Sequence, residues 1–201
     1  MHIPDGLMLP LLLGIGWILA IAFLAMAAKR TKQLLPEEKI PTMAVLAAGI
    51  FVAQMLNFPI AGGTSGHLIG ATIATLLVGP WAAILVMSIV IIIQGLMFGD
   101  GGILSLGLNL TNMALIGVIV SATVLRTVGT MKLRSEIPIF SAAWFAVFIA
   151  ALACALELAL SYAVSGGVYG IIWTISLPAM LVTHAMIGIG EAAISVAVIS
   201  Y

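Results

Sequence analysis

Long apolar runs separated by short polar stretches dominate the chain from about residue 8 to residue 199. A membrane-spanning helix needs about 20 predominantly apolar residues, or about 30 Å at 1.5 Å per residue. The runs predict seven transmembrane helices, at residues 8–28, 42–58, 66–78, 81–98, 103–125, 137–164 and 177–199. The run at 66–78 is short for a crossing and could instead form a re-entrant half-helix.

The composition agrees with a chain that is solvated by lipid. Of its residues, 63% are hydrophobic and 7% are charged, and the mean hydropathy is +1.30. A water-soluble domain of this length would need a more polar surface. We therefore predict an all-α integral membrane protein in which residues 1–201 form a single membrane domain. The formal net charge is zero and the basic residues lie between apolar runs, which argues against a nucleic-acid surface.

The basic residues predict the orientation of the chain. All Lys and Arg residues lie in two clusters, one after the first predicted span and one after the fifth: Lys29, Arg30, Lys32, Lys39, Arg126, Lys132 and Arg134. Short cytoplasmic loops collect such residues, so both clusters are expected in the cytoplasm with an even number of crossings between them. This condition holds if 66–78 spans. The N-terminus is then outside the cell membrane and the C-terminus is cytoplasmic.

The terminal sequence Met1-His2-Ile3-Pro4-Asp5-Gly6 has the potential to chelate a metal. No basic residue precedes the first apolar run, so a cleaved signal peptide is not expected, and the large His2 side chain disfavours removal of Met1. The Met1 amine, the His2 amide nitrogen and the His2 imidazole can then close two fused chelate rings around one ion. A deprotonated amide favours square-planar or tetragonal nitrogen fields, which indicates Cu²⁺ or Ni²⁺, with Co²⁺ also compatible.

A planar site needs a fourth donor, and His67 is the candidate. It follows the glycine-rich segment Gly62-Gly63-Thr64-Ser65-Gly66, which can approach another backbone closely. Two crossings separate His67 from the N-terminus, so His2 and His67 are expected on the same outer face. We predict that Met1, His2 and His67 hold the metal.

Further polar residues are expected in the same outer half, where they would line or brace one pocket: Asn57, Ser65, Gln94, Asp100, Asn109 and His184. A charged group at mid-helix costs about 2.5–3.5 kcal/mol by insertion scales, so such residues usually face protein or a cavity. They could orient metal-bound imidazoles or simply hydrogen-bond between helices. Glu157 and Glu191 are deeper and could relay protons, bind a cation or stay protonated and hydrogen-bonded.

Four stretches resemble the CbiM/NikM family, whose members are substrate-binding S components of energy-coupling factor (ECF) transporters for cobalt and nickel. The resemblance extends from the first residue to Glu191. The stretches are Met1-His2-Ile3-Pro4-Asp5-Gly6, Gly63-Thr64-Ser65-Gly66-His67-Leu68, Gln94-Gly95-Leu96-Met97-Phe98-Gly99-Asp100-Gly101-Gly102 and His184-Ala185-Met186-Ile187-Gly188-Ile189-Gly190-Glu191.

This resemblance implies seven helices and an outward-facing site in which the Met1 amine, the His2 amide and ring, and His67 bind Ni²⁺ or Co²⁺ as the transported ligand. It also implies partners: a transmembrane coupling subunit, a pair of cytoplasmic ATPases and, in some systems, a small accessory membrane subunit. The chain has no G-x-x-x-x-G-K-[ST], so ATP hydrolysis is expected on the partners. Neither an enzymatic activity nor a cofactor is expected for this chain.

Three other functions are weighed against this one. An S component for an organic vitamin would use the polar pocket for a larger solute, and the terminal chelate argues against it. A structural or assembly subunit would bind no metal, and changing His67 would have no effect. An intramembrane enzyme lacks support, because there is no H-E-x-x-H and no serine–histidine pair with recognisable spacing.

Overall fold

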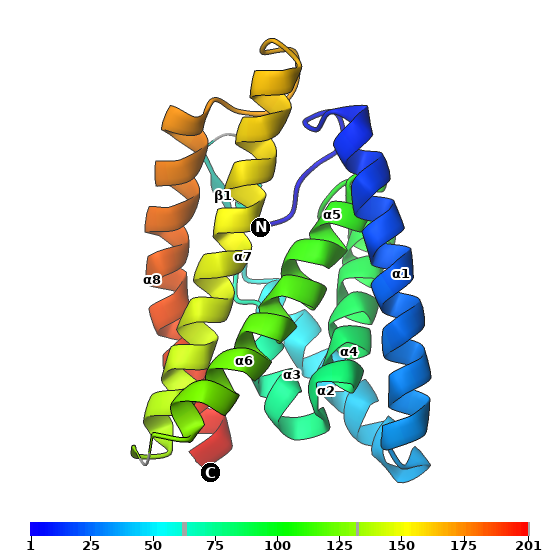
Figure 1. Ribbon diagram of the computed structural model, residues 1–201, viewed down its shortest axis with the longest axis vertical. Coiled ribbons are helices and arrows are strands. Elements are labelled where there is room, and N and C mark those ends of the chain that lie inside the picture. Colours follow the sequence, from blue (N-terminus) through cyan, green and yellow to red (C-terminus); the bar gives the residue numbers. More distant parts are fainter. Residues whose placement is uncertain (62–63, 132, 201) are drawn as a thin grey trace.

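The computed structural model describes residues 1–61, 64–131 and 133–200. Gly62 and Gly63 of the predicted glycine-rich segment, and Lys132 of the second basic cluster, lie outside these ranges. The described residues form a bundle of helices that run mostly along one axis (Figure 1). In chain order the elements are α1 (Pro10–Leu34), η1 (Glu37–Lys39), α2 (Ile40–Gln54), β1 (Phe58–Ile60), β2 (Thr64–Gly66), α3 (Ala71–Val78), α4 (Pro80–Ile93), η2 (Gln94–Phe98), α5 (Leu106–Leu110), η3 (Thr111–Ile116), α6 (Gly117–Gly129), α7 (Glu136–Val164) and α8 (Trp173–Ser200).

Among the described residues, five helical stretches are long and apolar enough to cross a membrane: Pro10–Leu34, Pro80–Phe98, Leu106–Gly129, Glu136–Val164 and Trp173–Ser200. Two of them contain a π-helical turn, η2 and η3, without a break in the helix. Such turns are rare and often occur at functional sites. The remaining helices, α2 and α3, are shorter, and α3 is only about 12 Å long at 1.5 Å per residue.

The predicted span 66–78 is therefore helical only from Ala71 onward. Gly70 precedes α3 with a φ of 85°, and Gly79 follows it with a φ of 80°. These left-handed conformations favour glycine because other residues meet steric conflict there. Pro80 then starts α4, where its fixed φ suits the first helical position.

A short β-hairpin precedes α3, which the all-α prediction did not include. β1 and β2 are antiparallel, with Phe58 opposite Gly66, Pro59 opposite Ser65 and Ile60 opposite Thr64. A proline inside a helix would remove a backbone donor and clash with the preceding turn, so Pro59 favours an extended chain. The hairpin carries Ser65 and leads directly to His67.

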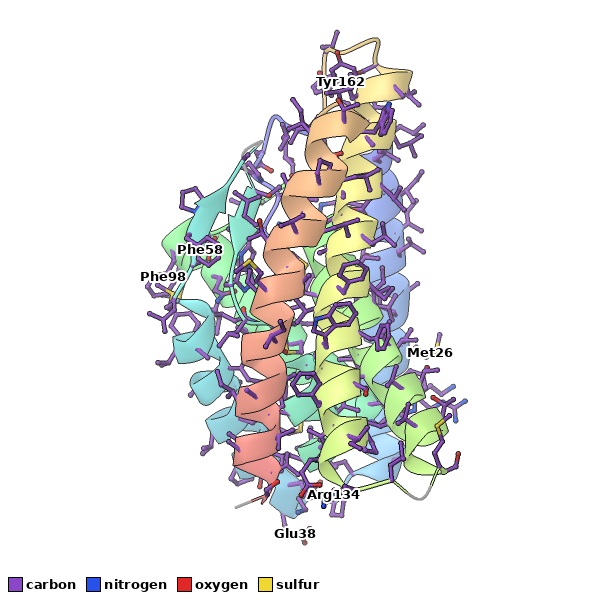
Figure 2. The ribbon with its side chains drawn as sticks, turned by 90° about the vertical axis from the view of Figure 1, so that its left-hand side faces the viewer. Met26, Glu38, Phe58, Phe98, Arg134 and Tyr162 are labelled. Carbon is purple, nitrogen blue, oxygen red and sulfur yellow. The ribbon has the colours of Figure 1, made fainter. Side chains whose placement is uncertain are left out.

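The described residues of the two basic clusters lie at the same end of the molecule. Figure 2 shows Glu38 of η1 and Arg134 at one end and Tyr162 of α7 at the other. The guanidinium of Arg30 lies 6.0 Å from the Trp81 ring, at the start of α4. This arrangement agrees with an even number of crossings between the clusters.

α7 packs along α8 and α6, and α1 packs along α4 and α5. The buried face of α7 is formed mainly by small residues: Ala142, Ala143, Ala146, Ala150, Ala151, Cys154 and Ala155. Small side chains let helix backbones approach closely, which stabilises helix pairs in lipid. The site described next lies between these two groups of helices.

Candidate metal site

The segment 1–9 runs from the start of α1 into the middle of the bundle, where Met1 lies (Figure 1). Met1 is fully buried, and His2 is 2% exposed. At the end of this segment nearer α1, the Gly170 N–H donates to the Leu7 carbonyl at 2.6 Å. The N-terminus is thus a packed part of the protein interior, which the sequence analysis did not foresee.

Asn109 fixes the backbone of Ile3. Its Oδ1 accepts the Ile3 N–H at 2.8 Å, and its Nδ2 donates to the Ile3 carbonyl at 3.2 Å. The Gly102 N–H also donates to that carbonyl, at 2.9 Å. The Asn109 amide thus pairs with Ile3 as a neighbouring strand would, and this pairing sets the position of the two residues before it.

Asp5 ties the N-terminal segment to the loop before α5. Its carboxylate accepts the backbone N–H groups of Ile103 at 2.9 Å and Ser105 at 3.0 Å. A Cβ atom on Gly102 would lie 2.0 Å from Asp5 Oδ1, so this position admits no side chain. The sequence analysis did not single out Asp5 as functional. The available signal was an aspartate in a turn, since Asp side chains commonly accept backbone N–H groups.

Ser65 on β2 contacts both backbone nitrogens of the terminal dipeptide. The Met1 amine donates to the Ser65 carbonyl and lies 3.2 Å from its Oγ, and the His2 N–H donates to the same Oγ at 3.1 Å. Pro59 is opposite Ser65 in the hairpin. Because proline has no N–H, the two residues form a non-hydrogen-bonded pair, in which the Ser65 carbonyl points away from β1 and accepts from Met1.

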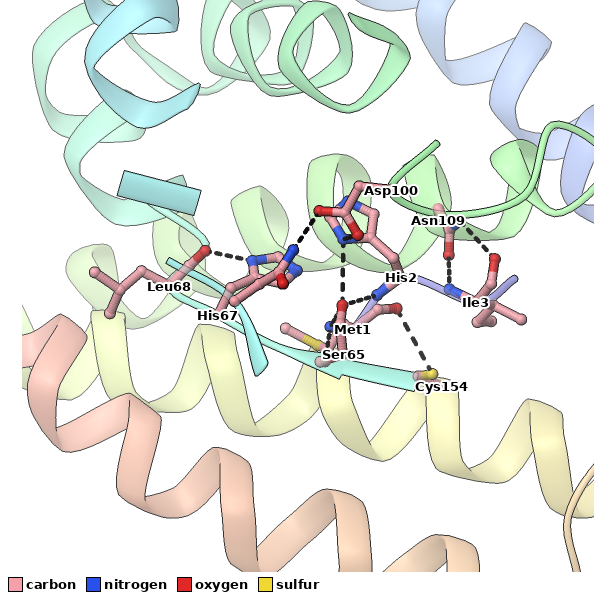
Figure 3. Close-up of polar contacts among 10 residues, drawn as sticks. Met1, His2, Ile3, Ser65, His67, Leu68, Asp100, Asn109 and Cys154 are labelled. Carbon is pink, nitrogen blue, oxygen red and sulfur yellow. Dashed lines mark hydrogen bonds and ion pairs between the residues drawn. The ribbon is translucent and has the colours of Figure 1, made fainter. Parts of the chain in front are cut away.

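The imidazole rings of His2 and His67 stack, with 4.6 Å between their centroids and 23° between their planes. Figure 3 shows both rings beside Met1, Ser65 and Asp100. His2 Nδ1 lies 3.2 Å from Asp100 Oδ1 and 3.3 Å from Ser65 Oγ. Asp100 in turn accepts a hydrogen bond from Asn57 Nδ2 at 2.7 Å. The structure therefore brings these predicted residues together.

The tautomer of His67 follows from its contacts. Its Nδ1 lies 2.7 Å from the Leu68 carbonyl, and a carbonyl can only accept, so Nδ1 carries the proton. Nε2 then has a free lone pair. This atom is buried and has no hydrogen-bond partner in the part of the chain that the structure describes.

The loop after His67 is held from two sides. The Glu191 carboxylate accepts the backbone N–H groups of Ile69 and Gly70, the latter at 2.8 Å. Gln54 Nε2 donates to the Ile69 carbonyl at 2.6 Å. Glu191 therefore satisfies backbone donors at the start of α3, where a negative group is also favourable to the helix dipole.

The environment keeps the nitrogen donors neutral. Burial lowers the pKa of the Met1 amine to about 5, and the opposite effects of Cys154 and Asp100 are smaller. Burial also lowers the pKa of His2, partly offset by its hydrogen bond with Asp100. The pKa of His67 is well below its usual range, first because of burial and then because of the Met1 amine and His2. At about pH 7 all three groups expose lone pairs rather than charges.

The candidate donors are thus an amine, a backbone amide and two imidazoles. Within residues 1–61, 64–131 and 133–200, no group of three or more His, Cys, Asp or Glu side chains is arranged to hold a metal. A site that uses backbone nitrogens does not need such a group. Nitrogen-rich planar sets suit Ni²⁺ and Cu²⁺.

The other predicted residues take different positions. Gln94 starts η2 and is buried, and neither end of its amide has a partner in the described part of the chain. His184 on α8 is also fully buried. Glu157 accepts a hydrogen bond from Asn112 Nδ2 at 2.7 Å and contacts none of the predicted metal ligands through a hydrogen bond.

The fold is shared with a solved membrane transport protein. A crystal structure of a truncated transition metal transporter superposes with a TM-score of 0.94 at 36% identity and covers 100% of this chain and 97% of that one. A second crystal structure, of a transition metal transporter, gives the same TM-score and identity and covers 92% of that chain. The bundle with its inserted N-terminus is therefore the fold of a transition metal transport protein.

Sequence comparison gives the family. The model of the cobalt uptake substrate-specific transmembrane region, CbiM, matches residues 2–201. Over its full length this chain is 40% identical to a protein of Haloquadratum walsbyi assigned to metal transport, of which it covers 89%. It is 32% identical to a protein of Archaeoglobus fulgidus assigned to cobalt transport, of which it covers 94%. The chain belongs to the CbiM family of substrate-specific membrane components for cobalt or nickel uptake.

Some relatives are longer. A fused NikMN protein of Archaeoglobus fulgidus, assigned to nickel transport, is 39% identical, and this chain spans 65% of its length. The relatives thus include proteins assigned to nickel and proteins assigned to cobalt.

Proposed function

We propose that this chain is the S component of an ATP-driven ECF importer and that it captures Ni²⁺ or Co²⁺ from outside the cell. The proposed ligands are the Met1 amine, the His2 amide nitrogen, His2 Nδ1 and His67 Nε2. The proposal requires Met1 to be the first residue of the mature protein. The observation that carries it is the buried Nε2 of His67, which has no partner among the described residues and lies beside the stacked His2 ring and the Met1 amine.

Metal binding would replace contacts that the free site makes. The His2 amide would lose its proton and its hydrogen bond to Ser65 Oγ. His2 Nδ1 would leave Asp100, and the ring proton would move to Nε2. The Met1 amine would turn its lone pair from the protein toward the ion. These groups need no large rearrangement because they already lie together.

Gln94 has a defined role in this state. It is near enough to His2 to raise the pKa of that ring, yet its amide oxygen has no partner among the described residues. A metal-bound imidazole usually donates its other N–H to a nearby oxygen, which fixes the ring. We assign the Gln94 oxygen as the acceptor for His2 Nε2–H.

A small ion fits this site better than an organic solute. His2 and His67 are 2% and 1% exposed, so the two rings are enclosed by protein. A cavity of about 870 Å³ lies between α1, α2 and α4, and neither histidine lines it. These features favour metal capture over a vitamin-type ligand and over an assembly subunit without substrate.

The proposal extends to the membrane and the partners. The chain would cross the cell membrane seven times, with α2 and α3 included, the basic clusters in the cytoplasm and the N-terminus entering from outside. A coupling subunit and two ATPases would supply the energy, and a small accessory membrane subunit would assist in some systems. The homologues assigned to nickel and cobalt transport support a role in uptake.

An uptake assay tests this function. The native-start chain would be expressed with its coupling subunit and ATPases, and accumulation of radioactive Ni²⁺ or Co²⁺ would be measured with and without the His67→Ala substitution. We expect His67→Ala to abolish ATP-dependent uptake, and Val182→Ala, which changes a 63% exposed residue on α8, to leave it intact. Equal uptake by His67→Ala and the unchanged protein would exclude the proposed site.

A further inference from the structure

One face of α8 lies along the segment that carries His67. Met180, His184, Ile187 and Glu191 recur at helical spacing and share this face. Thr64 Oγ1 contacts Met180 Sδ at 3.1 Å, and Glu191 accepts the N–H groups beyond His67. The hairpin beside α8 can be followed in Figure 2, where Phe58 is labelled.

A third contact places His184 opposite the site. A Cβ atom on Gly66 would lie 3.1 Å from Ile187 Cδ1, so Gly66 is directly against α8. His184 lies between Met180 and Ile187 on this face, and both of those residues contact β2. His184 is therefore level with the strand that binds the terminal dipeptide.

His184 has the same tautomer as His67, with a free lone pair on Nε2. Its Nδ1 lies 2.8 Å from the Met180 carbonyl, so Nδ1 carries the proton and Nε2 has the lone pair. The side chain is fully buried, and Nε2 has no hydrogen-bond partner within the described ranges. His184 is also among the groups that lower the pKa of His67, which agrees with their closeness. A buried imidazole nitrogen without a partner is unfavourable unless a ligand completes it.

We propose that His67 and His184 form a second metal position, to which the ion transfers when it leaves the N-terminal chelate. This proposal rests on the function proposed above. His67 keeps its bond to the metal while His184 Nε2 replaces the Met1 and His2 nitrogens, and water fills the other positions. The ion stays divalent, and the His2 amide regains one proton from water. Two neutral imidazoles bind a divalent ion more weakly than a chelate that includes a deprotonated amide, so the second position favours release.

The second position is tested with the chelate disabled. A Gly-Ser extension before Met1 removes the free amine, and His2→Ala in the same protein removes the His2 ring. Co²⁺ is then titrated into this purified full-length protein. X-ray absorption should show two imidazoles on the bound ion. His184→Phe, which keeps a ring of similar volume, should weaken this residual binding by about tenfold or more and reduce the count to one. Val182→Ala is the matched control on α8. An unchanged affinity and imidazole count in His184→Phe would overturn the proposal.

A second variant tests the position by the appearance of a new absorption band, which a misfolded protein would not produce. In the same extended protein, His184→Cys should produce a cobalt–thiolate absorption band, because cysteine sulfur binds such ions directly. The extended protein with His184 unchanged carries the same buried Cys154 and gives the baseline. Absence of the band in folded His184→Cys protein would contradict the proposal.

Uptake separates this proposal from the proposed function. In the complete transporter with the native start, at a Ni²⁺ concentration that saturates capture, His184→Phe should lower the initial uptake rate by about tenfold or more. Unchanged uptake would exclude a transfer role for His184 and leave metal capture standing. If instead the native-start protein binds no Ni²⁺ or Co²⁺ at all, the proposed function itself fails.

Discussion

The rings of His2 and His67 stack with 4.6 Å between their centroids, although one lies near the N-terminus and the other follows a hairpin after α2. Neither ring makes a hydrogen bond through Nε2 to any residue that the structure describes. Two buried imidazoles with free lone pairs at this distance are unfavourable on their own. A metal ion bound by His67 Nε2 and His2 Nδ1 would remove that cost, because His2 Nε2 would then carry the ring proton and donate it to Gln94. This is the basis of the account.

If Gln94 orients the His2 ring, replacing it should lower metal affinity although the proposed ligands Met1, His2 and His67 are unchanged. Gln94→Leu removes the acceptor for His2 Nε2–H, and metal affinity should fall by about 10-fold to 100-fold, as for other groups that orient a metal-bound imidazole. Titration of purified protein with Ni²⁺ measures this. Leu96→Ala, at a 59% exposed position of the same π-helical turn, should bind as the unchanged protein does. Full affinity in Gln94→Leu would remove Gln94 from the site.

Asn109 should control the position of the N-terminal segment. Asn109→Leu leaves the Ile3 N–H without its acceptor, at a cost of about 1–3 kcal/mol for a buried group, and metal binding should weaken by about tenfold or more for the same free energy. Asn109→Asp can still accept the Ile3 N–H but cannot donate to the Ile3 carbonyl. Its metal affinity should therefore be intermediate between those of Asn109→Leu and the native protein. Calorimetric titration with Ni²⁺ gives the order. If both variants bind Ni²⁺ as tightly as the native protein does, Asn109 does not position the N-terminal segment.

The pH dependence of binding reports which donors carry protons. The pKa of the Met1 amine is about 5, and those of His2 and His67 are lowered, so these groups are already neutral at about pH 7. Only the His2 amide then loses a proton, and about one proton should be released per metal ion. Below about pH 5 the amine is protonated, and affinity should fall more steeply as pH decreases.

Calorimetry in buffers of different ionisation enthalpy counts these protons. Release of two or more at about pH 7 would mean that the amine or an imidazole is protonated in the free site. Release of none would mean that the amide nitrogen is not a ligand.

Glu191 should stabilise the loop that presents His67. Glu191→Gln keeps one oxygen acceptor but places an NH₂ group against the second backbone N–H, so we expect a loss of about 1–3 kcal/mol in folding stability. Thermal unfolding in detergent, followed by tryptophan fluorescence, measures the change. Glu157→Gln is a useful comparison, because Glu157 accepts from the Asn112 side chain and not from this loop. A transition temperature equal to that of the native protein would contradict the role of Glu191.

The sequence allowed much of this arrangement to be predicted. The apolar runs indicated the long helices, and counting crossings placed His2 and His67 on one face, where their rings in fact stack. The burial of Met1 was not predictable, because it depends on contacts with Ser65 and Asn109, which are distant in sequence. The hairpin was missed because its strands have only three residues each and join two apolar runs.

The roles of Gly102, Asp5 and Glu191 could not be predicted for the same reason, since each depends on contacts with residues distant in sequence. Gly102 is required by Asp5, which lies in another part of the chain, so no local pattern marks either residue as structural. Glu191 was left open between proton relay, cation binding and hydrogen bonding, and it accepts two backbone N–H groups at the start of α3. Such roles depend on tertiary pairing rather than on spacing along the chain.

The most direct test of the central claim is the affinity of Ni²⁺ for protein with and without two residues added before Met1. A Gly-Ser extension at the N-terminus turns the terminal amine into an amide, whereas the same two residues added after Tyr201 serve as the control. We predict that the N-terminal extension weakens binding by about 100-fold or more and abolishes the visible absorption of the planar complex, while the C-terminal extension changes neither. Equal affinity and an unchanged spectrum in the N-terminally extended protein would contradict the account.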